Sequence, residues 1–563
     1  MKHLIKYTIS AAAALLLSTG LSSCVGDLDV TPRDPNISLE YDAEGLFNKC
    51  YSVFGLEGNG GGGSMDIVAN DAGFTGLVRQ MWNSNELCTD EAICGWGDDG
   101  ISSFVYNTYD QNHNMLAMYY NRLTLGINFC NQYINQQADY NKTMTAEIRL
   151  LRSIMYYLLT DAFGNPPFAT ELVTPKQRNR AEMMKWIEDE VNDLLPDLRE
   201  PKAKKSSDIA YGRVDKAAAY MLLMRIYLNS EVYTGTARYD EAAQMARKVI
   251  NETDYRLNMN PSVKQVPKKD ANGQPLKDED GNVITETWTY SAYQMLFMGD
   301  NGETEAAYEA IFPILADGQK TQQWGCSQFL MASTYADGMF ASKYDHTSTN
   351  GTAEAWSGNR ARYDLAHKFF PQDNAPSGQA YDVAVAAKDD RALLCTEDHT
   401  MHATNPSEFK SGYGVAKFNN FRTDGSASSH STFADTDFFF FRLAECYLTL
   451  AECDARLHGG TTTTEGTNAI NTLHRRANAT ERTSGGYTLR DILDEWSKEF
   501  YFEGRRRVDL IRYGYFGGDN DYMWEWKGGA LEGRQFGAYR NIFPLPSDDL
   551  TANKNLKQND GYK

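Results

Sequence analysis

The chain has 563 residues, enough for one large domain or two to three ordinary ones, and its formal net charge is −20. Such an acidic surface disfavours nucleic acids, anionic lipids and anionic glycans as partners, and it favours neutral ligands. The 33 tyrosines and 9 tryptophans provide many rings that can stack on an uncharged ligand.

The first 23 residues have the pattern of an export leader. Lys2 and Lys6 precede an apolar stretch, residues 7–17, that is too short to span a bilayer as a mature helix. Small residues then lead to Cys24, a pattern typical of bacterial lipoproteins, in which the leader is cleaved and the cysteine is acylated. The alternative is an ordinary signal peptide with a chance cysteine. Cleavage would remove both lysines and change the net charge from −20 to −22.

Residues 24–40 include Pro32 and Pro35, and they predict an extended tether between the lipid and the fold. Residues 41–563 are predicted to form one domain. No second stretch of membrane-spanning length follows Cys24, so we expect the lipid alone to hold the protein at the membrane. The eight other cysteines lack zinc-like spacing, and most of them are expected to be buried free thiols.

Helical periodicity dominates three scaffold regions, about residues 41–57, 111–260 and 438–515. Residues 147–163 carry an apolar face that ends at Gly164. The expected helix pairs are residues 217–228 with 239–250, 442–457 with 467–476, and 489–502 with 505–513. Two inserts predicted to be irregular, about residues 58–110 and 261–430, separate the scaffold regions, and Asn272-Gly273 and Asp280-Gly281 indicate a hairpin or loop in the second. We expect the binding chemistry in these inserts.

Several segments, in this order, resemble the SusD/RagB family of surface glycan-binding lipoproteins. They are residues 146–152 (AEIRLLR), 212–213 (GR), 441–445 (FRLAE), 499–506 (EFYFEGRR), 509–512 (DLIR), 543–546 (FPLP) and 555–562 (NLKQNDGY). The resemblance implies a mostly α-helical, SusD-like fold, in which tetratricopeptide-like helix pairs support long irregular inserts that form the ligand face. It also implies a SusC-type TonB-dependent transporter as partner. Asp27 and Asp29 resemble the export tag of surface lipoproteins in the Bacteroidetes, which implies an outer-membrane location at the cell surface.

The resemblance also implies a binding site. Three tryptophans match the places where aromatic rings form a curved arc in a starch-binding member of the family. Arg79 and Asp71 match its polar contacts by position, and Asp99 is a third polar candidate. The implied site residues are Trp96, Trp324, Trp356, Arg79, Asp71 and Asp99. At the position of Trp324 that family member has tyrosine, and at the position of Asp99 it has asparagine, so the amide donor of that contact is absent from this chain.

Elementary chemistry supports the aromatic residues. Glucose presents an apolar face of C–H groups, and an indole ring is the largest flat surface that can match it. Each stack is worth ~1 kcal/mol beyond the buried area. Three rings set in a curve select a curved polymer such as α-1,4-glucan. The sequence therefore predicts a non-catalytic protein that binds starch or malto-oligosaccharides and requires no cofactor. The alternative for each tryptophan is a packing role, which we expect for Trp186, Trp496, Trp524 and Trp526.

Two charged groups of residues are candidates for further sites. Asp300, Asp435 and Asp437 offer the oxygen ligands that Ca²⁺ prefers, and the alternative is a set of solvated loop carboxylates. Glu503, Arg505, Arg506 and Asp509 could suggest acid–base or phosphate chemistry, but charges at this spacing favour structural ion pairs.

Two other functions stay open. The first is the same family role with another neutral glycan, such as a fructan or mannan, or with peptides. The second is a secreted glycoside hydrolase, which requires two carboxylates at a defined separation across a cleft. The adjacent pairs Asp98-Asp99 and Asp389-Asp390 do not imply that geometry, because neighbouring side chains point in different directions.

Overall fold

The computed structural model describes residues 42–171, 173–270 and 274–562. The predicted leader, the lipidation site Cys24, the tether and the Asn272-Gly273 turn lie outside these residues. Residues Phe47–Lys563 form one compact unit, which carries the long helices and the candidate site.

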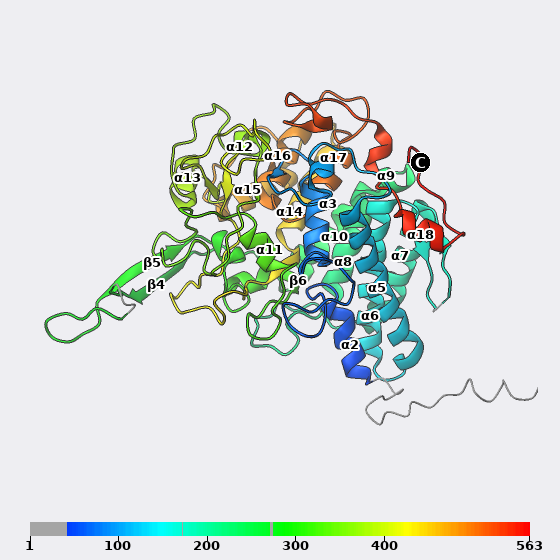
Figure 1. Cartoon of the computed structure of the whole chain (residues 1–563), viewed down its shortest axis with the longest axis horizontal. Helices are drawn as coiled ribbons and strands as arrows, with labels where there is room; N and C mark the ends of the chain where they lie inside the picture. Colours follow the sequence, from blue (N-terminus) through cyan, green and yellow to red (C-terminus); the bar gives the residue numbers. More distant parts are fainter. Residues whose placement is uncertain (1–41, 172, 271–273, 563) are drawn as a thin grey trace, which may run out of the picture. The chain divides into compact units, whose positions relative to one another are not determined.

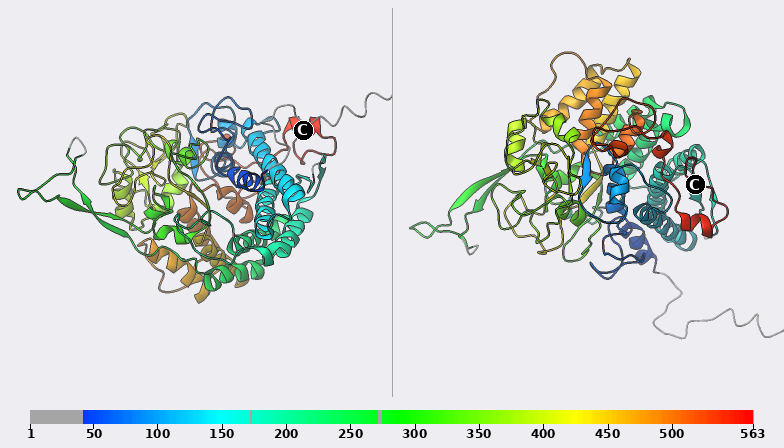
Figure 2. Two further views of the ribbon diagram at one scale, coloured as in Figure 1. Left: turned by 90° about the horizontal axis from the view of Figure 1, so that it is seen from below. Right: turned by 45° about the horizontal axis from the view of Figure 1, so that its top comes forward.

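Antiparallel helices follow one another side by side through this unit (Figures 1 and 2). Helix α5 packs on α6, α6 on α7, α8 on α10, α10 on α14 and α14 on α15. Their bounds are α5 Asn114–Gln137, α6 Lys142–Phe163, α7 Arg180–Leu194, α8 Lys216–Leu228, α10 Tyr239–Glu252, α14 Ala444–Leu457, α15 Thr464–Arg476, α16 Leu489–Phe500 and α17 Arg506–Arg512. The mostly helical fold predicted from the sequence is confirmed.

Shorter helices complete the set. They are α2 Ala43–Ser52, α3 Leu77–Glu86, α4 Ile101–Val105, α9 Ser230–Thr234, α11 Ser327–Ala332, α12 Tyr363–Phe369, α13 Ala380–Ala387 and α18 Ser547–Ala552, with 3₁₀ turns at Leu195–Asp197, Gln294–Phe297, Glu305–Glu309, Lys527–Gly529 and Ala538–Asn541.

Side-chain caps explain where the long helices begin. The Asn141 side chain accepts a hydrogen bond from the Met144 backbone N–H at the start of α6, and Gly164, with φ of 70°, ends that helix. Helix α7 begins with a capping box of Asn179 and Glu182, in which each side chain binds the other residue's backbone N–H. Such local signals explain why helix starts can be recognised in the sequence.

The described strands form two-stranded antiparallel pairs. The pairs are β1 Ala92–Cys94 with β7 Asn359–Ala361, β2 Pro167–Phe168 with β3 Lys176–Gln177, β4 Ser262–Pro267 with β5 Thr285–Tyr290, β6 Ala310–Ile314 with β10 Phe438–Arg442, and β8 Leu394–Cys395 with β9 Gly414–Val415. The β1–β7 pair joins the two predicted inserts directly, and the β4–β5 pair extends outward as an arm (Figure 1).

One sequence prediction about local structure is wrong, and one predicted helix begins two residues later than expected. The first insert contains helix α3, all ten residues of which are buried, because it packs against α5 and α17. The helix expected from residue 442 begins at Ala444 instead, since the phenylalanine run before Arg442 pairs with β6 as strand β10. In both cases long-range packing, which a local pattern does not contain, decides the structure.

A buried charge cluster lies where β10 meets α15 and α16. It consists of Glu309, Lys417, Arg442, Arg476, Glu499 and Glu503. Arg442 lies within 2.7 Å of both Glu499 and Glu503, and these side chains are at most 5% exposed. The positive neighbours hold the Glu499 pKa at about 2 despite burial, which by itself raises it.

The other charges in and just after the EFYFEGRR segment also form structural pairs. Arg506 lies 2.7 Å from Asp90, and Arg505 lies 3.0 Å from Asp509. The ion-pair role predicted for these residues is therefore confirmed. The eight cysteines from Cys50 onward are buried and free, as expected for most of them.

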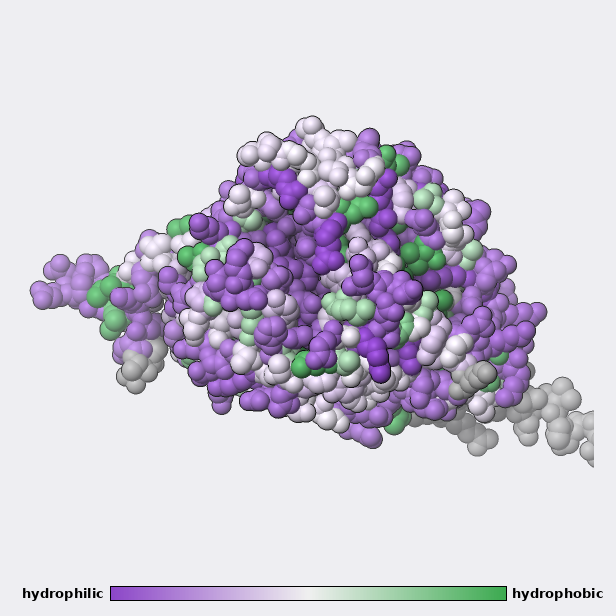
Figure 3. Space-filling model, turned by 90° about the horizontal axis from the view of Figure 1, so that it is seen from above, coloured by the Kyte–Doolittle hydropathy of each residue, from purple (hydrophilic) through white to green (hydrophobic). Residues whose placement is uncertain are grey.

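No helix in the described part of the chain is long and apolar enough to cross a membrane. The face of the molecule seen in Figure 3 is largely hydrophilic, with hydrophobic residues scattered singly or in small groups.

Candidate functional site

The β1–β7 pair brings Trp96 and Trp356 together from segments 260 residues apart. Trp96 follows strand β1 and Trp356 precedes strand β7, so antiparallel pairing places the two indoles side by side. Their ring centroids are 6.3 Å apart and the rings are tilted by 51°. A Cβ added to Gly358 would lie 2.1 Å from the Trp96 ring, so the close approach requires glycine at this position.

The third predicted tryptophan lies next to this pair. Trp324 lies just before α11, and its ring centroid is 5.9 Å from that of Trp356 with a tilt of 42°. The Phe433 ring packs on Trp324 at 4.7 Å. Trp356 is therefore the central ring of three, and all three side chains are only half-buried.

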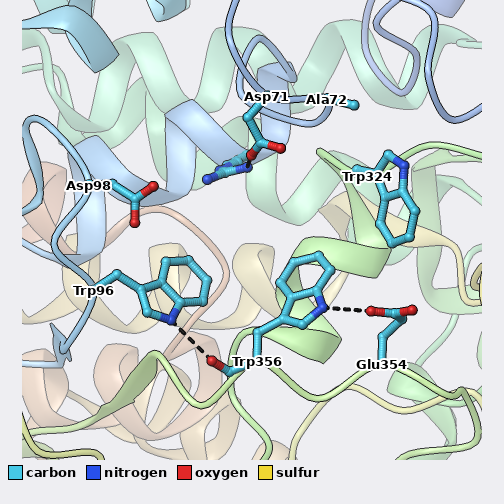
Figure 4. Close-up of a pocket in the computed structure, with 8 residues that line it drawn as sticks. Asp71, Ala72, Trp96, Asp98, Trp324, Glu354 and Trp356 are labelled. Carbon is cyan, nitrogen blue, oxygen red and sulfur yellow. Dashed lines mark hydrogen bonds and ion pairs between the residues drawn. The ribbon is translucent and has the colours of Figure 1, made fainter.

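Hydrogen bonds hold the rings of Trp96 and Trp356 in place (Figure 4). The Trp96 Nε1–H donates to the Trp356 carbonyl oxygen at 3.1 Å, and the Trp356 Nε1–H donates to the Glu354 carboxylate at 2.8 Å. Glu354 is a site residue that the sequence interpretation missed. Its signal was weak, because a glutamate two residues before a tryptophan in a loop has no specific pattern.

Around the rings is a pocket of about 450 Å³, called the tryptophan pocket here. It is lined by Asp71, Ala72, Arg79, Trp96, Asp98, Trp324, Glu354 and Trp356. Asp71 faces the indoles from the opposite side of the pocket (Figure 4). The lining thus combines an aromatic wall with a polar wall of three carboxylates and one guanidinium.

The buried helix α3 supplies the guanidinium. Arg79 is 5% exposed, its Nη1 lies 3.4 Å from the Asp71 carboxylate, and its guanidinium lies over the Phe329 ring at 5.1 Å. Its Nε has no hydrogen-bond partner in the described part of the structure.

Asp98 and Asp99 are both exposed, but only Asp98 lines the pocket. The two residues belong to a turn, in which the Ile101 N–H donates to the Asp98 carbonyl oxygen, so that adjacent side chains point in different directions. A match by sequence position does not resolve which of two neighbouring aspartates faces the pocket.

A second missed residue, Glu57, supports the pocket from behind. Its carboxylate accepts a hydrogen bond from the Gly73 N–H, and a Cβ added to Gly325 would lie 2.0 Å from Glu57 Oε1. Glu57 therefore joins the loop of Asp71 to the segment of Trp324. Burial raises the Glu57 pKa to about 7, although the Gly73 N–H and Arg122 favour its ionised form.

The carboxylates predicted to bind calcium do not form a ligand set. Asp437 accepts a hydrogen bond from the Tyr211 hydroxyl at 2.8 Å, and Asp300 and Asp435 accept hydrogen bonds from backbone N–H groups. Among the described residues no group of three or more His, Cys, Asp or Glu side chains could hold a metal ion. The residues present therefore do not fit the calcium site, because these three side chains do not converge as a ligand set and protein donors already bind most of their oxygens.

The other tryptophans predicted to pack lie outside the tryptophan pocket. Trp496 and Trp524 are buried, at 1% and 2% exposure, which confirms their core role. Trp186 and Trp526 are half-buried: Trp186 packs on Tyr156, and the Trp526 Nε1–H donates to a backbone carbonyl oxygen.

Comparison with known proteins places the chain in one family. Residues 242–562 match the SusD family. The chain is 35% identical over 599 aligned residues to the starch-binding protein SusD of Bacteroides thetaiotaomicron, with 99% of each chain covered. Its fold is similar to a SusD superfamily protein from Bacteroides vulgatus, with a TM-score of 0.62, 18% identity and coverage of 93% and 99%.

A similar fold is found in the surface glycan-binding protein A of Bacteroides thetaiotaomicron in complex with laminarihexaose, with a TM-score of 0.61, 18% identity and coverage of 92% and 98%. From the family match and the identity along the whole sequence, the chain belongs to the SusD family of carbohydrate-binding proteins.

Proposed function

We propose that this protein binds starch and malto-oligosaccharides in the tryptophan pocket, as a non-catalytic glycan-binding protein. The observation that carries the proposal is the row of three half-buried indoles with successive tilts of 51° and 42°. A further support is the relative that is 35% identical and is named a starch-binding protein.

The tilts favour a curved ligand over a flat one. A glucose unit on each ring would stack with its C–H face against the indole, and the successive tilts turn those faces in steps around the pocket. An α-1,4-glucan already has such curvature in solution, so that binding would cost little additional ordering. A ribbon such as cellulose would contact the rings less well.

The charges of the pocket favour a neutral ligand. Asp71, Asp98 and Glu354 line it together with the single guanidinium of Arg79. Sulfates or uronic acids would meet net negative charge there, whereas hydroxyls can donate to the carboxylates and accept from Arg79. Modest affinity, on the order of micromolar to millimolar, follows from a few exposed stacks that must offset ordering of the glycan.

The proposal also includes the protein's place in the cell. We propose a lipid anchor at Cys24, a location on the outer-membrane surface, and delivery of the glycan to a SusC-like TonB-dependent transporter. Labelling with a radioactive fatty acid tests the anchor, since a Cys24→Ala variant is expected to incorporate no label. Co-purification with an outer-membrane barrel tests the partner, and its absence from detergent extracts would contradict it.

Affinity electrophoresis tests the glycan. We expect retardation of the wild-type protein in gels containing amylopectin, and no retardation in gels containing levan or mannan. Trp356→Ala and Trp96→Ala should strongly reduce the retardation, while Trp186→Ala serves as a matched control outside the pocket. Unchanged retardation in both pocket variants would show that the tryptophan pocket is not the site.

A β-1,3-glucan is the second candidate, because one similar structure is a complex with laminarihexaose. A laminarin gel distinguishes it: retardation there and not in amylopectin would replace starch by laminarin in the proposal. A hydrolase would instead release new reducing ends from amylose, and we expect none.

A further inference from the structure

Outside the tryptophan pocket, a larger cavity of about 740 Å³ lies at the base of the β4–β5 arm, and it is called the second pocket here. Three separate segments line it: residues of the arm, residues 344–351 and residues 420–428. Because these segments come from different parts of the second insert, the cavity is formed by tertiary packing.

A rigid aromatic pair forms one wall of the second pocket. The Trp288 ring on β5 and the Tyr344 ring stack at 5.2 Å with an interplanar angle of 12°. Trp288 is 6% exposed and Tyr344 is half-buried, so Trp288 is the inner ring of the pair and Tyr344 the outer one. The Tyr344 hydroxyl accepts a hydrogen bond from the Thr289 N–H at 3.0 Å, which fixes the orientation of the ring.

The rest of the lining is polar and close to electrical balance. Lys268 and Lys269 oppose Asp270, Glu286 and Asp345, and the remaining polar side chains are hydroxyls, an amide and an imidazole. Such a lining suits a ligand with many hydroxyls and no charge. With its fixed aromatic ring, it has the chemistry that binds a sugar.

The second pocket and the tryptophan pocket share one loop. Gly351 lines the second pocket and Glu354 lines the tryptophan pocket. Three residues of extended chain span at most about 11 Å, so the Cα atoms of Gly351 and Glu354 are no farther apart than that. The loop is held in place: the buried Asn350 donates to the Glu354 carbonyl oxygen at 2.8 Å, and a Cβ on Gly351 would lie 2.6 Å from the Asn420 backbone.

We propose that the second pocket binds a further segment of the same neutral polysaccharide that occupies the tryptophan pocket. This inference rests on the proposed function. Once a polymer is bound at one pocket, its binding at the other is intramolecular and loses little further translational freedom. Only chains long enough to reach both pockets gain this affinity. The protein would thereby prefer polysaccharide to short oligosaccharides.

The test compares two ligand lengths. Tyr344→Ala should reduce apparent affinity for amylopectin, measured by gel retardation, by roughly 10–100-fold, because attachment at two sites becomes attachment at one. Its binding of maltotriose at the tryptophan pocket, measured by calorimetry, should equal that of the wild type. Tyr344→Phe keeps the ring and should retain binding of the polymer.

A second pair of variants tests the pocket without changing its aromatic support. Ala427 is exposed and lines the second pocket, so Ala427→Arg places bulk in the cavity and should weaken amylopectin binding as Tyr344→Ala does. Val385→Arg is the matched control, because Val385 is 78% exposed on α13 and lines neither pocket.

The outcomes separate the two proposals. Wild-type retardation in both Tyr344→Ala and Ala427→Arg overturns the second pocket and leaves the tryptophan pocket in place. If Tyr344→Ala does not fold, Ala427→Arg decides alone. Residual retardation of Trp356→Ala that disappears in Trp356→Ala/Tyr344→Ala supports the second pocket. A wild-type protein that amylopectin does not retard overturns the proposed starch function and this inference with it.

Discussion

The buried charge cluster and the tryptophan pocket differ in how they use their side chains. In the cluster, Arg442 meets Glu309, Glu499 and Glu503 in the interior, and the charges bind one another. In the tryptophan pocket, three half-buried rings and one guanidinium line a cavity together with carboxylates. The comparison shows that a dense group of charges in the sequence can serve to stabilise the fold. The residues of the candidate binding site, by contrast, come from segments far apart in the sequence.

The largest expected effect follows from removing one charge of the cluster. Arg442→Met would leave the three buried glutamates of the cluster with only Lys417 and Arg476 as positive partners within the cluster, one charge short, and it should lower the free energy of unfolding by about 3–5 kcal/mol. Urea denaturation measures the change. The control is Arg247→Met, whose ion pair with Glu465 is exposed and should contribute only about 0–1 kcal/mol. Equal losses in the two variants would contradict a structural role for the cluster.

Two tryptophan variants sharpen the comparison further. Trp496→Ala removes a ring that is 1% exposed and should cost about 3–5 kcal/mol of stability, with glycan affinity per folded molecule unchanged. Trp356→Ala should show the reverse, a small loss of stability and a large loss of affinity. Thermal denaturation and affinity electrophoresis on the same samples measure both. A large loss of stability in Trp356→Ala would reassign that ring to packing.

The third prediction concerns pH and Glu57. Its folded-state pKa of about 7 lies above the ordinary value of 4.5, because burial disfavours the charge. Between these values the folded state therefore binds more protons at Glu57 than the unfolded state does. The contribution of this group to stability is largest below pH 4.5 and falls as pH rises through 7. Relative to pH 4, the ionisation of Glu57 should lower the free energy of unfolding by on the order of 3 kcal/mol at pH 8.

Glu57→Gln keeps an acceptor for the Gly73 N–H but cannot ionise. Denaturation between pH 4 and 8 should therefore show the variant gaining stability relative to wild type as pH rises. Other buried acids contribute equally to both proteins and cancel in the difference. A difference that stays constant with pH would contradict the raised pKa.

The smallest effect is expected for the hydrogen bond that orients the central ring. Glu354→Leu removes the acceptor of the Trp356 Nε1–H and should weaken glycan binding by about 1 kcal/mol, or roughly fivefold. Glu354→Gln keeps an acceptor and should bind nearly as well as wild type. Equal weakening in both variants would instead assign the effect to the lost charge. Electrophoresis in amylopectin gels distinguishes these outcomes.

Much of the helical scaffold could be predicted because its signals are local. The apolar face before Gly164 predicted the end of α6, and the pair formed by α8 and α10 lies within two residues of its expected bounds. Helix α3 was missed because it is a short segment within a glycine-rich insert, and its burial comes from packing against α5 and α17, which lie far away in the sequence. The strand β10 was missed because its partner, β6, lies more than 120 residues earlier.

For the candidate site, the sequence determined which residue types are available: three tryptophans in inserts, and acidic residues near them. Tertiary structure decided the rest. Antiparallel pairing of β1 with β7 places Trp96 beside Trp356, and Asp98 rather than Asp99 lines the pocket. Glu354 accepts a hydrogen bond from the Trp356 ring, and Glu57 accepts one from the Gly73 backbone behind the pocket. The physical reason is that helices follow from contacts a few residues apart, whereas a pocket between loops depends on contacts hundreds of residues apart.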